Sequence, residues 1–260
     1  MVAAPDLYCS RMTPLVLLLA TGAALVVLSL VTARPPTAPI PDLAGYFERW
    51  APLHNGYDPR GNPWLRGWLT MSYGIARPLA RRGVLPDMLT VWSIWLAFAV
   101  FVPAAAGGRW PMLAGWILVA SGLGDTLDGC VAVLTDRTTR WGYVFDSFAD
   151  RINDVVYLFA IVSVGAPAEL ALAAGLAFGL LEYLRARAGN AGMGEIGVVT
   201  VGERAMRVIF CSAGIHFGGV FVDRAPLVAT LGLAALTTFS VVGLVQLVVV
   251  VRRRLIGLPS

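Results

Sequence analysis

Seven apolar runs divide this chain of 260 residues, and each is about as long as a membrane-spanning helix. A helix needs about 20 predominantly apolar residues to cross the hydrocarbon core of a bilayer. Only 14% of the residues are charged, whereas a soluble domain carries about a quarter. We therefore predict an all-α integral membrane protein, with spans at residues 14–33, 88–107, 111–134, 142–165, 167–185, 206–222 and 226–251.

The basic residues predict how these spans are oriented, and all 20 of them are arginine. Sixteen lie on one side of the predicted bundle, in residues 34–87, 135–140, 185–207 and 252–254, and only Arg11, Arg109 and Arg224 lie on the other. Because cytoplasmic loops are enriched in basic residues, we expect the N-terminus outside the cell and the C-terminus inside. The chain is thus predicted to be a multi-pass protein of the cell (plasma) membrane.

The absence of lysine argues against several kinds of chemistry. Schiff-base catalysis, a Walker-type phosphate loop and the His/Lys/Asp phospholipase-type transferases all need lysine. The two histidines, His54 and His216, lie far apart in the sequence. Cys9, Cys130 and Cys211 match neither a disulfide framework nor a zinc site. Histidine-based catalysis is therefore not expected.

The spans and the arginines divide the chain into four segments. Residues 1–33 form an N-terminal transmembrane anchor, 34–87 a cytoplasmic segment of interfacial amphipathic helices, 88–251 a six-span catalytic membrane domain, and 252–260 a basic cytoplasmic tail. In the second segment, apolar residues recur at helical spacing with arginines between them, which is typical of helices lying in the membrane interface. Packing of such a helix on the end of the bundle fits the same pattern. Asp87 is the predicted N-cap of the first span of the catalytic domain.

Five aspartates lie in or beside two successive spans: Asp125, Asp128, Asp146, Asp150 and Asp154. A charged side chain at the centre of a bilayer helix costs about 2.5–3.5 kcal/mol on insertion scales. The first two are three residues apart and the others are four apart, so each set lines one face of a helix. Because the two helices form an antiparallel hairpin, both rows can share cations. Carboxylate oxygens suit Mg²⁺ or Mn²⁺, and four carboxylates suit two ions.

The order of these residues resembles the signature of the CDP-alcohol phosphatidyltransferases, namely Asp125-x-x-Asp128-Gly129-x-x-Ala132 and then Gly142-x-x-x-Asp146-x-x-x-Asp150. The resemblance extends over about residues 62–210 and implies a six-helix membrane bundle, usually homodimeric, preceded by an interfacial helix. The span at 14–33 lies outside it. The implied reaction of phospholipid biosynthesis transfers a phosphatidyl or similar group from a CDP-linked lipid donor to a small alcohol such as a polyol phosphate, with release of CMP. The lipid bilayer is an expected partner, and nucleic acid is not.

The resemblance also implies a role for each motif residue. Asp125, Asp128 and Asp146 would be metal ligands. Asp150 would bind metal as well and would act as the general base on the acceptor hydroxyl. The expected nucleotide-binding residues are Asp87, Thr126, Gly129 and Ala132. The arginines that would line the acceptor site, as in phosphatidylinositol-phosphate and phosphatidylglycerol-phosphate synthases, are Arg185, Arg187, Arg204 and Arg207. Orientation in the membrane alone would also explain arginines in these places.

Three positions depart from the family pattern. Val133 stands where the family has an arginine that contacts a phosphate. We predict that Arg137, one helical turn further on, takes that place in nucleotide binding if the helix continues. Glu182 and Gly189 stand where the inositol-phosphate enzymes tend to have serine and glutamate, so the acceptor alcohol is left open.

Two further charged residues lie in the second of these spans. Asp154 falls outside the motif and is predicted to support the site without binding metal. Arg151 follows Asp150 within the span, so it is expected to pair with a carboxylate such as Asp154 or Glu182 instead of facing lipid.

Two other functions are compatible with the aspartate cluster. An intramembrane prenyltransferase also binds magnesium pyrophosphate through aspartate-rich helices, but its acidic motifs usually lie further apart than Asp128 and Asp146 do. A catalytically degenerate membrane scaffold of the same fold is the second alternative, because Val133 removes an expected phosphate contact. Release of CMP from a CDP-linked lipid, dependent on Mg²⁺ or Mn²⁺, would separate the three functions.

Overall fold

The computed structural model describes residues 5–54, 56–193 and 200–256, and within them it contains helices and no strand. The nine α-helices of this part of the chain are α1 (Pro5–Val31), α2 (Leu43–Leu53), α3 (Pro63–Arg81), α4 (Pro86–Ala106), α5 (Pro111–Thr135), α6 (Arg140–Ser163), α7 (Ala168–Asn190), α8 (Arg204–Val220) and α9 (Ala225–Ile256). Two short 3₁₀ turns, Pro59–Gly61 and Val222–Arg224, precede α3 and α9. The predicted all-α class is confirmed, and each of the seven predicted spans corresponds to a helix.

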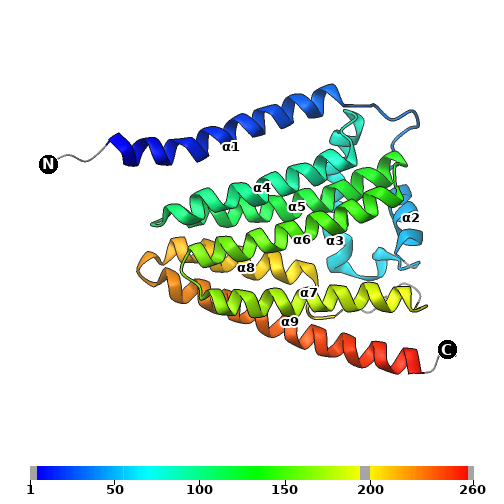
Figure 1. Cartoon of the computed structure of the whole chain (residues 1–260). Helices are drawn as coiled ribbons and strands as arrows, with labels where there is room; N and C mark the ends of the chain where they lie inside the picture. The colour runs from blue at the N-terminus through cyan, green and yellow to red at the C-terminus, as the bar shows by residue number, and fades with distance from the viewer. Residues whose placement is uncertain (1–4, 55, 194–199, 257–260) are drawn as a thin grey trace.

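Helices α4 to α9 lie side by side as a bundle, and α2 and α3 lie at one end of it (Figure 1). That end also holds the turn between α5 and α6, the end of α7, the start of α8 and the C-terminal end of α9 (Figure 1). These are the segments in which most of the arginines fall, so we call it the arginine-rich end. The main core lies between the six helices, and its fully buried side chains include Val100, Leu118, Tyr157, Ile161, Ile215 and Leu233.

Three segments of the described chain are long and apolar enough to cross a membrane on length and hydropathy alone: α4, α5 and Val222–Ile256. The apolar part of α1, Leu15–Val31, is shorter. Helix α6 covers residues 142–163 of the span predicted at 142–165, but it carries five charged residues in its first 15 positions: Arg140, Asp146, Asp150, Arg151 and Asp154. The charges that lower its hydropathy are therefore those of the motif itself.

Two helix ends differ from the prediction. Helix α4 begins at Pro86 with Leu85 at the N-cap, so Asp87 lies in the first turn and is not the cap. Proline is favoured at the first helical position because it has no N–H to satisfy and its φ angle is already helical. At the other end of the chain, α9 continues to Ile256, so the arginines at 252–254 belong to its last turns. Residues 257–260 lie outside the described part.

The N-terminal helix α1 lies along the outside of the bundle and contacts it through α4 (Figure 1). The indole N–H groups of Trp92 and Trp95 donate to the hydroxyls of Ser29 and Thr21, each at 3.0 Å. Between these bonds, a Cβ at Gly22 would lie 2.6 Å from the Trp95 ring. The contact is therefore specific but narrow.

Helices α2 and α3 pack on the end of α5. The Tyr46 hydroxyl lies 3.0 Å from the Cys130 sulfur, and both groups are buried. On α3, Leu69 and Tyr73 are buried on the side facing α5, whereas Trp64 is exposed. The structure thus shows α3 packed on the end of the bundle through one face, with Trp64 exposed on another.

The linker between α1 and α2 is bound to the start of α4 and to the turn between α5 and α6. The backbone N–H of Arg34 donates to the carbonyl of Gly83 at 2.8 Å. Gly83 has φ +79°, and a Cβ there would lie 2.5 Å from the Arg34 backbone, so only glycine fits. The Arg137 guanidinium donates to the carbonyls of Arg34 at 2.7 Å and Pro35 at 3.4 Å.

Candidate functional site

Two rows of carboxylates face each other at the arginine-rich end of the bundle. Asp125 and Asp128 are one turn apart on α5, and Asp146 and Asp150 are one turn apart on α6. Oxygen atoms of Asp125, Asp146 and Asp150 all lie within 4.8 Å of one another. We call these three residues the carboxylate trio. The hairpin geometry expected from the sequence therefore brings three of the four predicted metal ligands together.

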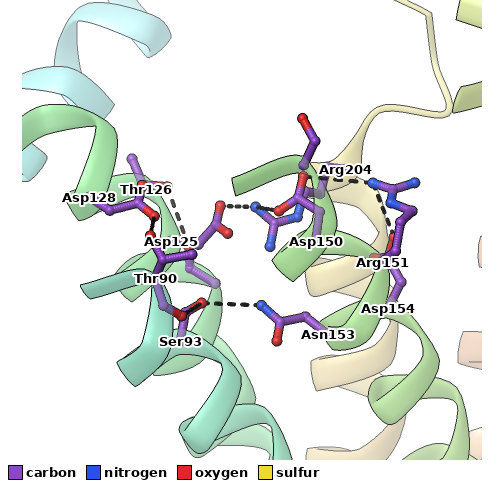
Figure 2. Close-up of polar contacts among 12 residues, drawn as sticks. Thr90, Ser93, Asp125, Thr126, Asp128, Asp150, Arg151, Asn153, Asp154 and Arg204 are labelled. Atoms are coloured by element: carbon purple, nitrogen blue, oxygen red, sulfur yellow. Dashed lines mark hydrogen bonds and ion pairs between the residues drawn. The ribbon is translucent and has the colours of Figure 1, made fainter. Parts of the chain in front are cut away.

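Asp128, the fourth predicted ligand, lies outside the trio because two other groups hold its carboxylate. The Thr90 hydroxyl on α4 donates to its Oδ2 at 2.5 Å (Figure 2). The Gly129 N–H donates to its Oδ1. Thr90 belongs to neither helix of the hairpin, so the spacing of the aspartates does not reveal this contact. The hydroxyl fixes the orientation of Asp128 one turn beyond the trio.

Arg204, at the first position of α8, lies between the two rows. Its Nη1 forms ion pairs with Oδ2 of Asp125 and, at 2.7 Å, with Oδ1 of Asp150 (Figure 2). Three carboxylates with one arginine leave two negative charges at this place. A predicted acceptor residue is thus in direct contact with two predicted metal ligands.

The trio fits a hard divalent cation. It offers only carboxylate oxygens, the ligands that Mg²⁺ and Mn²⁺ prefer. Oδ1 of Asp125 is buried and has no hydrogen-bond partner among the described residues. A buried carboxylate oxygen without a partner is costly, and a cation would satisfy it.

Arg207, another predicted acceptor residue, lies in an ion-pair network of Arg151, Asp154, Arg207 and Glu182. We call it the buried ion-pair network because Asp154 and Arg207 at its centre are buried, whereas Arg151 and Glu182 are partly exposed. The Arg207 side chain is buried, and it donates to Asp154 at 2.8 Å and to Glu182 at 2.6 Å. Arg151 lies 3.3 Å from the same oxygen of Asp154 (Figure 2). The expected pairing of Arg151 with Asp154 and the supporting place of Asp154 agree with this geometry. Direct access of an acceptor to Arg207 does not, because its charge is enclosed by protein.

The remaining predicted acceptor arginines, Arg185 and Arg187, differ in their surroundings. Arg185 forms two hydrogen bonds with Glu203, at 2.8 and 3.3 Å. Burial raises the pKa of Glu203, but hydrogen bonds from Arg185 and Thr200 outweigh it and hold that pKa below the usual glutamate value. Arg187 is exposed and forms no ion pair within the described residues. It is thus the most accessible arginine of the four.

The predicted nucleotide-binding residues lie around the ends of α4, α5 and α6. A Cβ added at Gly129 would meet nothing within 4 Å, so open space adjoins this position. Ala132 is half-buried one turn further on, and the Thr126 hydroxyl donates to the Gly122 carbonyl of its own helix at 3.3 Å. The Asp87 carboxylate lies beside Gly142 at the start of α6.

Arg137 cannot replace the missing family arginine in the expected way, because the helix does not continue. Helix α5 ends at Thr135, and Asp136 adopts the left-handed conformation with φ +56°. The Arg137 guanidinium is directed to the linker carbonyls instead of along α5. Val133 is itself 7% exposed and packs in the core under α2 and α3. The prediction that Arg137 contacts the nucleotide required α5 to continue to residue 137, and that requirement is not met.

Sequence reasoning missed a chain of polar groups beneath the aspartates. The Tyr157 hydroxyl donates to Ser121 at 2.7 Å, and Ser121 donates to the Ser93 carbonyl at 2.7 Å. Asn153 donates to the Ser93 hydroxyl at 3.3 Å (Figure 2). These groups are buried and tie α4, α5 and α6 together. Small polar residues in apolar runs were the only signal, and many such residues merely bond to their own helix.

Comparison with known proteins gives consistent matches. The CDP-alcohol phosphatidyltransferase family profile matches residues 83–215. An archaetidylinositol phosphate synthase from Methanothermobacter thermautotrophicus is 35% identical over 171 residues, which cover 64% of this chain and 84% of that protein. A phosphatidylinositol phosphate synthase from Cutibacterium acnes is 27% identical over 198 residues, covering 72% and 95%.

Solved structures show the same fold. Two crystal structures of the phosphatidylinositol phosphate synthase of Mycobacterium tuberculosis, one with manganese and citrate and one with CDP-DAG bound, match with a TM-score of 0.57 at 24% identity. Each covers 70% of this chain, and the matches cover 88% and 94% of those chains. The prenyltransferase alternative is thereby set aside. The chain belongs to the CDP-alcohol phosphatidyltransferase family and is a transferase of phospholipid biosynthesis.

Proposed function

We propose that this enzyme transfers the phosphatidyl or a similar group of a CDP-linked lipid to the hydroxyl of a polyol, with release of CMP. The observation that carries the proposal is the carboxylate trio, three motif aspartates from two helices within 4.8 Å of one another. The relatives support the substrate class. They are named for inositol phosphate lipids, and a solved neighbour holds CDP-DAG.

Asp125, Asp146 and Asp150 would hold divalent cations, with Asp128 completing a site for two Mg²⁺ or Mn²⁺ ions. When bound, these cations would neutralise the pyrophosphate of the donor and the charge that develops on the departing CMP. The manganese complex of the Mycobacterium tuberculosis enzyme supports this choice of metal.

The protein's own part in the reaction centres on Asp150. Its carboxylate takes the proton of the acceptor hydroxyl, and the acceptor oxygen then bonds to the lipid-linked phosphorus. The bond between that phosphorus and the bridging oxygen breaks, and CMP leaves with the electron pair. Asp150 is suited to this role because it is half-buried and lies at the meeting point of α5, α6 and α8.

We assign the donor nucleotide to the space beside Gly129 and Ala132, with Asp87 and Thr126 at its edges. The acceptor lies nearer α7 and α8, where Arg185, Arg187 and Arg204 can contact a phosphate on the polyol. Arg204 contacts trio residues directly, so it is the arginine placed closest to both substrates.

We place the site at the cytoplasmic face of the plasma membrane, with seven spanning helices and the arginine-rich end inside the cell. The distribution of the arginines supports this orientation. The family resemblance supports a homodimer. Labelling of single cysteines from each side of intact cells would test the orientation, and cross-linking in membranes would test the dimer.

The decisive experiment measures CMP release from CDP-diacylglycerol by the purified protein, with inositol phosphate, glycerol phosphate, inositol or serine as the acceptor. We expect release that needs Mg²⁺ or Mn²⁺ and an added polyol acceptor, and that is lost in Asp150→Asn. The matched control is Asp223→Asn, an exposed aspartate near the opposite end of α8, which leaves the rate unchanged. No CMP release with any acceptor would instead support the catalytically degenerate scaffold.

A further inference from the structure

Arg207 combines two properties that an acceptor ligand does not have together. It is the largest fully buried side chain of the described residues, with 1% exposed. Its two terminal nitrogens are already used, one by Asp154 on α6 and one by Glu182 on α7. The guanidinium also lies 4.8 Å from the centre of the Phe178 ring, which adds a cation–π contact.

The charges of the buried ion-pair network balance. Two arginines, Arg151 and Arg207, face two carboxylates, Asp154 and Glu182. A phosphate entering here would have to displace a carboxylate from the buried Arg207, and that carboxylate would lose its closest partner at a high cost. Glu182 also lies 3.8 Å from Arg185, outside the network. Both arginine charges of the network are therefore matched by carboxylates, and none is left for an anionic substrate.

The network ends at the proposed base. Arg207 Nη1 and Arg151 Nη2 share one oxygen of Asp154, Oδ2, at 2.8 and 3.3 Å. The same Nη2 of Arg151 lies 3.6 Å from Oδ2 of Asp150 (Figure 2). Arg207 is thus linked to Asp150 through two intermediate side chains, both on α6.

The two oxygens of Asp150 face different partners. Oδ2 faces the network through Arg151, whereas Oδ1 lies 2.7 Å from Arg204 on the side of the trio. Because the two oxygens belong to one planar carboxylate, the contact of Arg151 with Oδ2 also sets the direction of Oδ1. Partners of this kind, which orient a ligand without touching the metal, commonly change metal affinity or activity by about 10- to 100-fold when removed.

We propose that Arg207 is a positioning residue, which fixes the Asp150 carboxylate through Asp154 and Arg151 and does not bind the acceptor. The inference rests on the proposed function, in which Asp150 is both a metal ligand and the base. Arginine suits the role because its planar fork joins carboxylates from two different helices in one geometry. Glu182 extends the network to α7 and closes the second arm of the fork.

The test must separate positioning from simple stability, since Arg207→Met alone removes the closest ion-pair partner of both Asp154 and Glu182 and leaves them only Arg151 at 3.3 Å and Arg185 at 3.8 Å. The main variant is therefore Arg207→Met with Asp154→Asn and Glu182→Gln, which removes the network's buried charges together and keeps the shapes. Arg207→Lys is the conservative variant, because it keeps the charge and loses the fork. Arg224→Gln, an exposed arginine beyond α8, is the matched control.

Steady-state kinetics with saturating CDP-diacylglycerol give the first readout. For the triple variant we expect kcat to fall by about 10- to 100-fold while the acceptor KM stays within about twofold, and Arg207→Lys to lie between it and the wild type. A rise of the acceptor KM by tenfold or more with an unchanged kcat would show Arg207 to be an acceptor ligand and would overturn the proposal.

Titration with Mn²⁺, followed by electron paramagnetic resonance, gives a readout that needs no turnover. We expect the triple variant to bind Mn²⁺ about tenfold more weakly than the wild type and Arg224→Gln do. The Tm of the three proteins is measured without metal and should be equal. Unchanged Mn²⁺ affinity in the triple variant would overturn the proposal. If the wild type binds Mn²⁺ but releases no CMP, the proposed function fails, and this titration alone decides the role of Arg207.

Discussion

Both clusters of charged side chains in the bundle take residues from α6, but they differ in the balance of acidic and basic groups. The carboxylate trio has three acids with Arg204 between them, and Arg151 of the network lies 3.6 Å from Asp150 at its edge. The buried ion-pair network has two acids against two arginines. Uncompensated buried charge is costly, so we expect the trio, and not the network, to bind cations. The balance of charge thus separates the candidate ligand site from the residues that support it.

The comparison is tested most strongly within the trio. Asp125→Asn removes one of the proposed carboxylate ligands, and we expect CMP release to fall more than about 100-fold, because loss of a ligand should exceed loss of an outer partner. The Tm without divalent cations should change little. Retention of Mn²⁺ affinity in this variant would show that Asp125 is not a ligand.

A substitution in the buried ion-pair network should lower the stability of the fold, whereas one in the trio should lower activity. Asp154→Ala leaves Arg207 without one of its two partners in a buried place, and we expect a loss of about 3–5 kcal/mol in the free energy of unfolding. Thermal unfolding in detergent would measure it. A variant with wild-type Tm would mean that the network is solvated and not closed.

Asp128 differs from both clusters, because the neutral Thr90 hydroxyl, and not an arginine, holds its carboxylate. Thr90→Val keeps the shape of the side chain and removes its hydrogen bond to Asp128. Hydrogen bonds to charged groups contribute about 1.5–3 kcal/mol, so we expect kcat or Mn²⁺ affinity to fall about tenfold. Thr90→Ser, which keeps the hydroxyl, should restore most of the loss, and equal loss in both variants would contradict this role.

The smallest predicted effect is a gain. Asp146 forms no ion pair within the described residues, although it lies beside two other carboxylates. Asp146→Asn should therefore raise the stability measured in a chelator by about 1 kcal/mol while it abolishes activity. The gain should vanish when Mn²⁺ is added, because the wild type is then stabilised by its ligand. A loss of stability in chelator would show that Asp146 is already compensated.

The bundle could be predicted from the sequence because bilayer-length apolar runs leave few alternatives. The trio could be predicted because period-four spacing on two helices of one hairpin brings their faces together. Thr90 could not be linked to Asp128, since α4 belongs to no part of that hairpin. The contact depends on how a third helix packs, which local spacing does not encode.

The arginines show the same limit. Arg204 and Arg207 are three residues apart on α8, with the same charge and the same expected role. One faces the trio and the other is enclosed between α6 and α7. Arg137 was misplaced for a local reason, because the left-handed Asp136 ends α5 and redirects the chain. The sequence does not show which face of α8 turns toward the trio, or that α5 stops at Thr135.

The clamp formed by Gly83 and Arg137 on the linker bears on how the protein can be shortened or fused. A truncation that removes α1 but keeps residues 34 and 35 retains the carbonyls that Arg137 holds beside the turn into α6. A truncation only two residues longer removes them and leaves that guanidinium without these partners. The cut site, more than the loss of the helix itself, is expected to decide whether the shortened enzyme keeps its geometry.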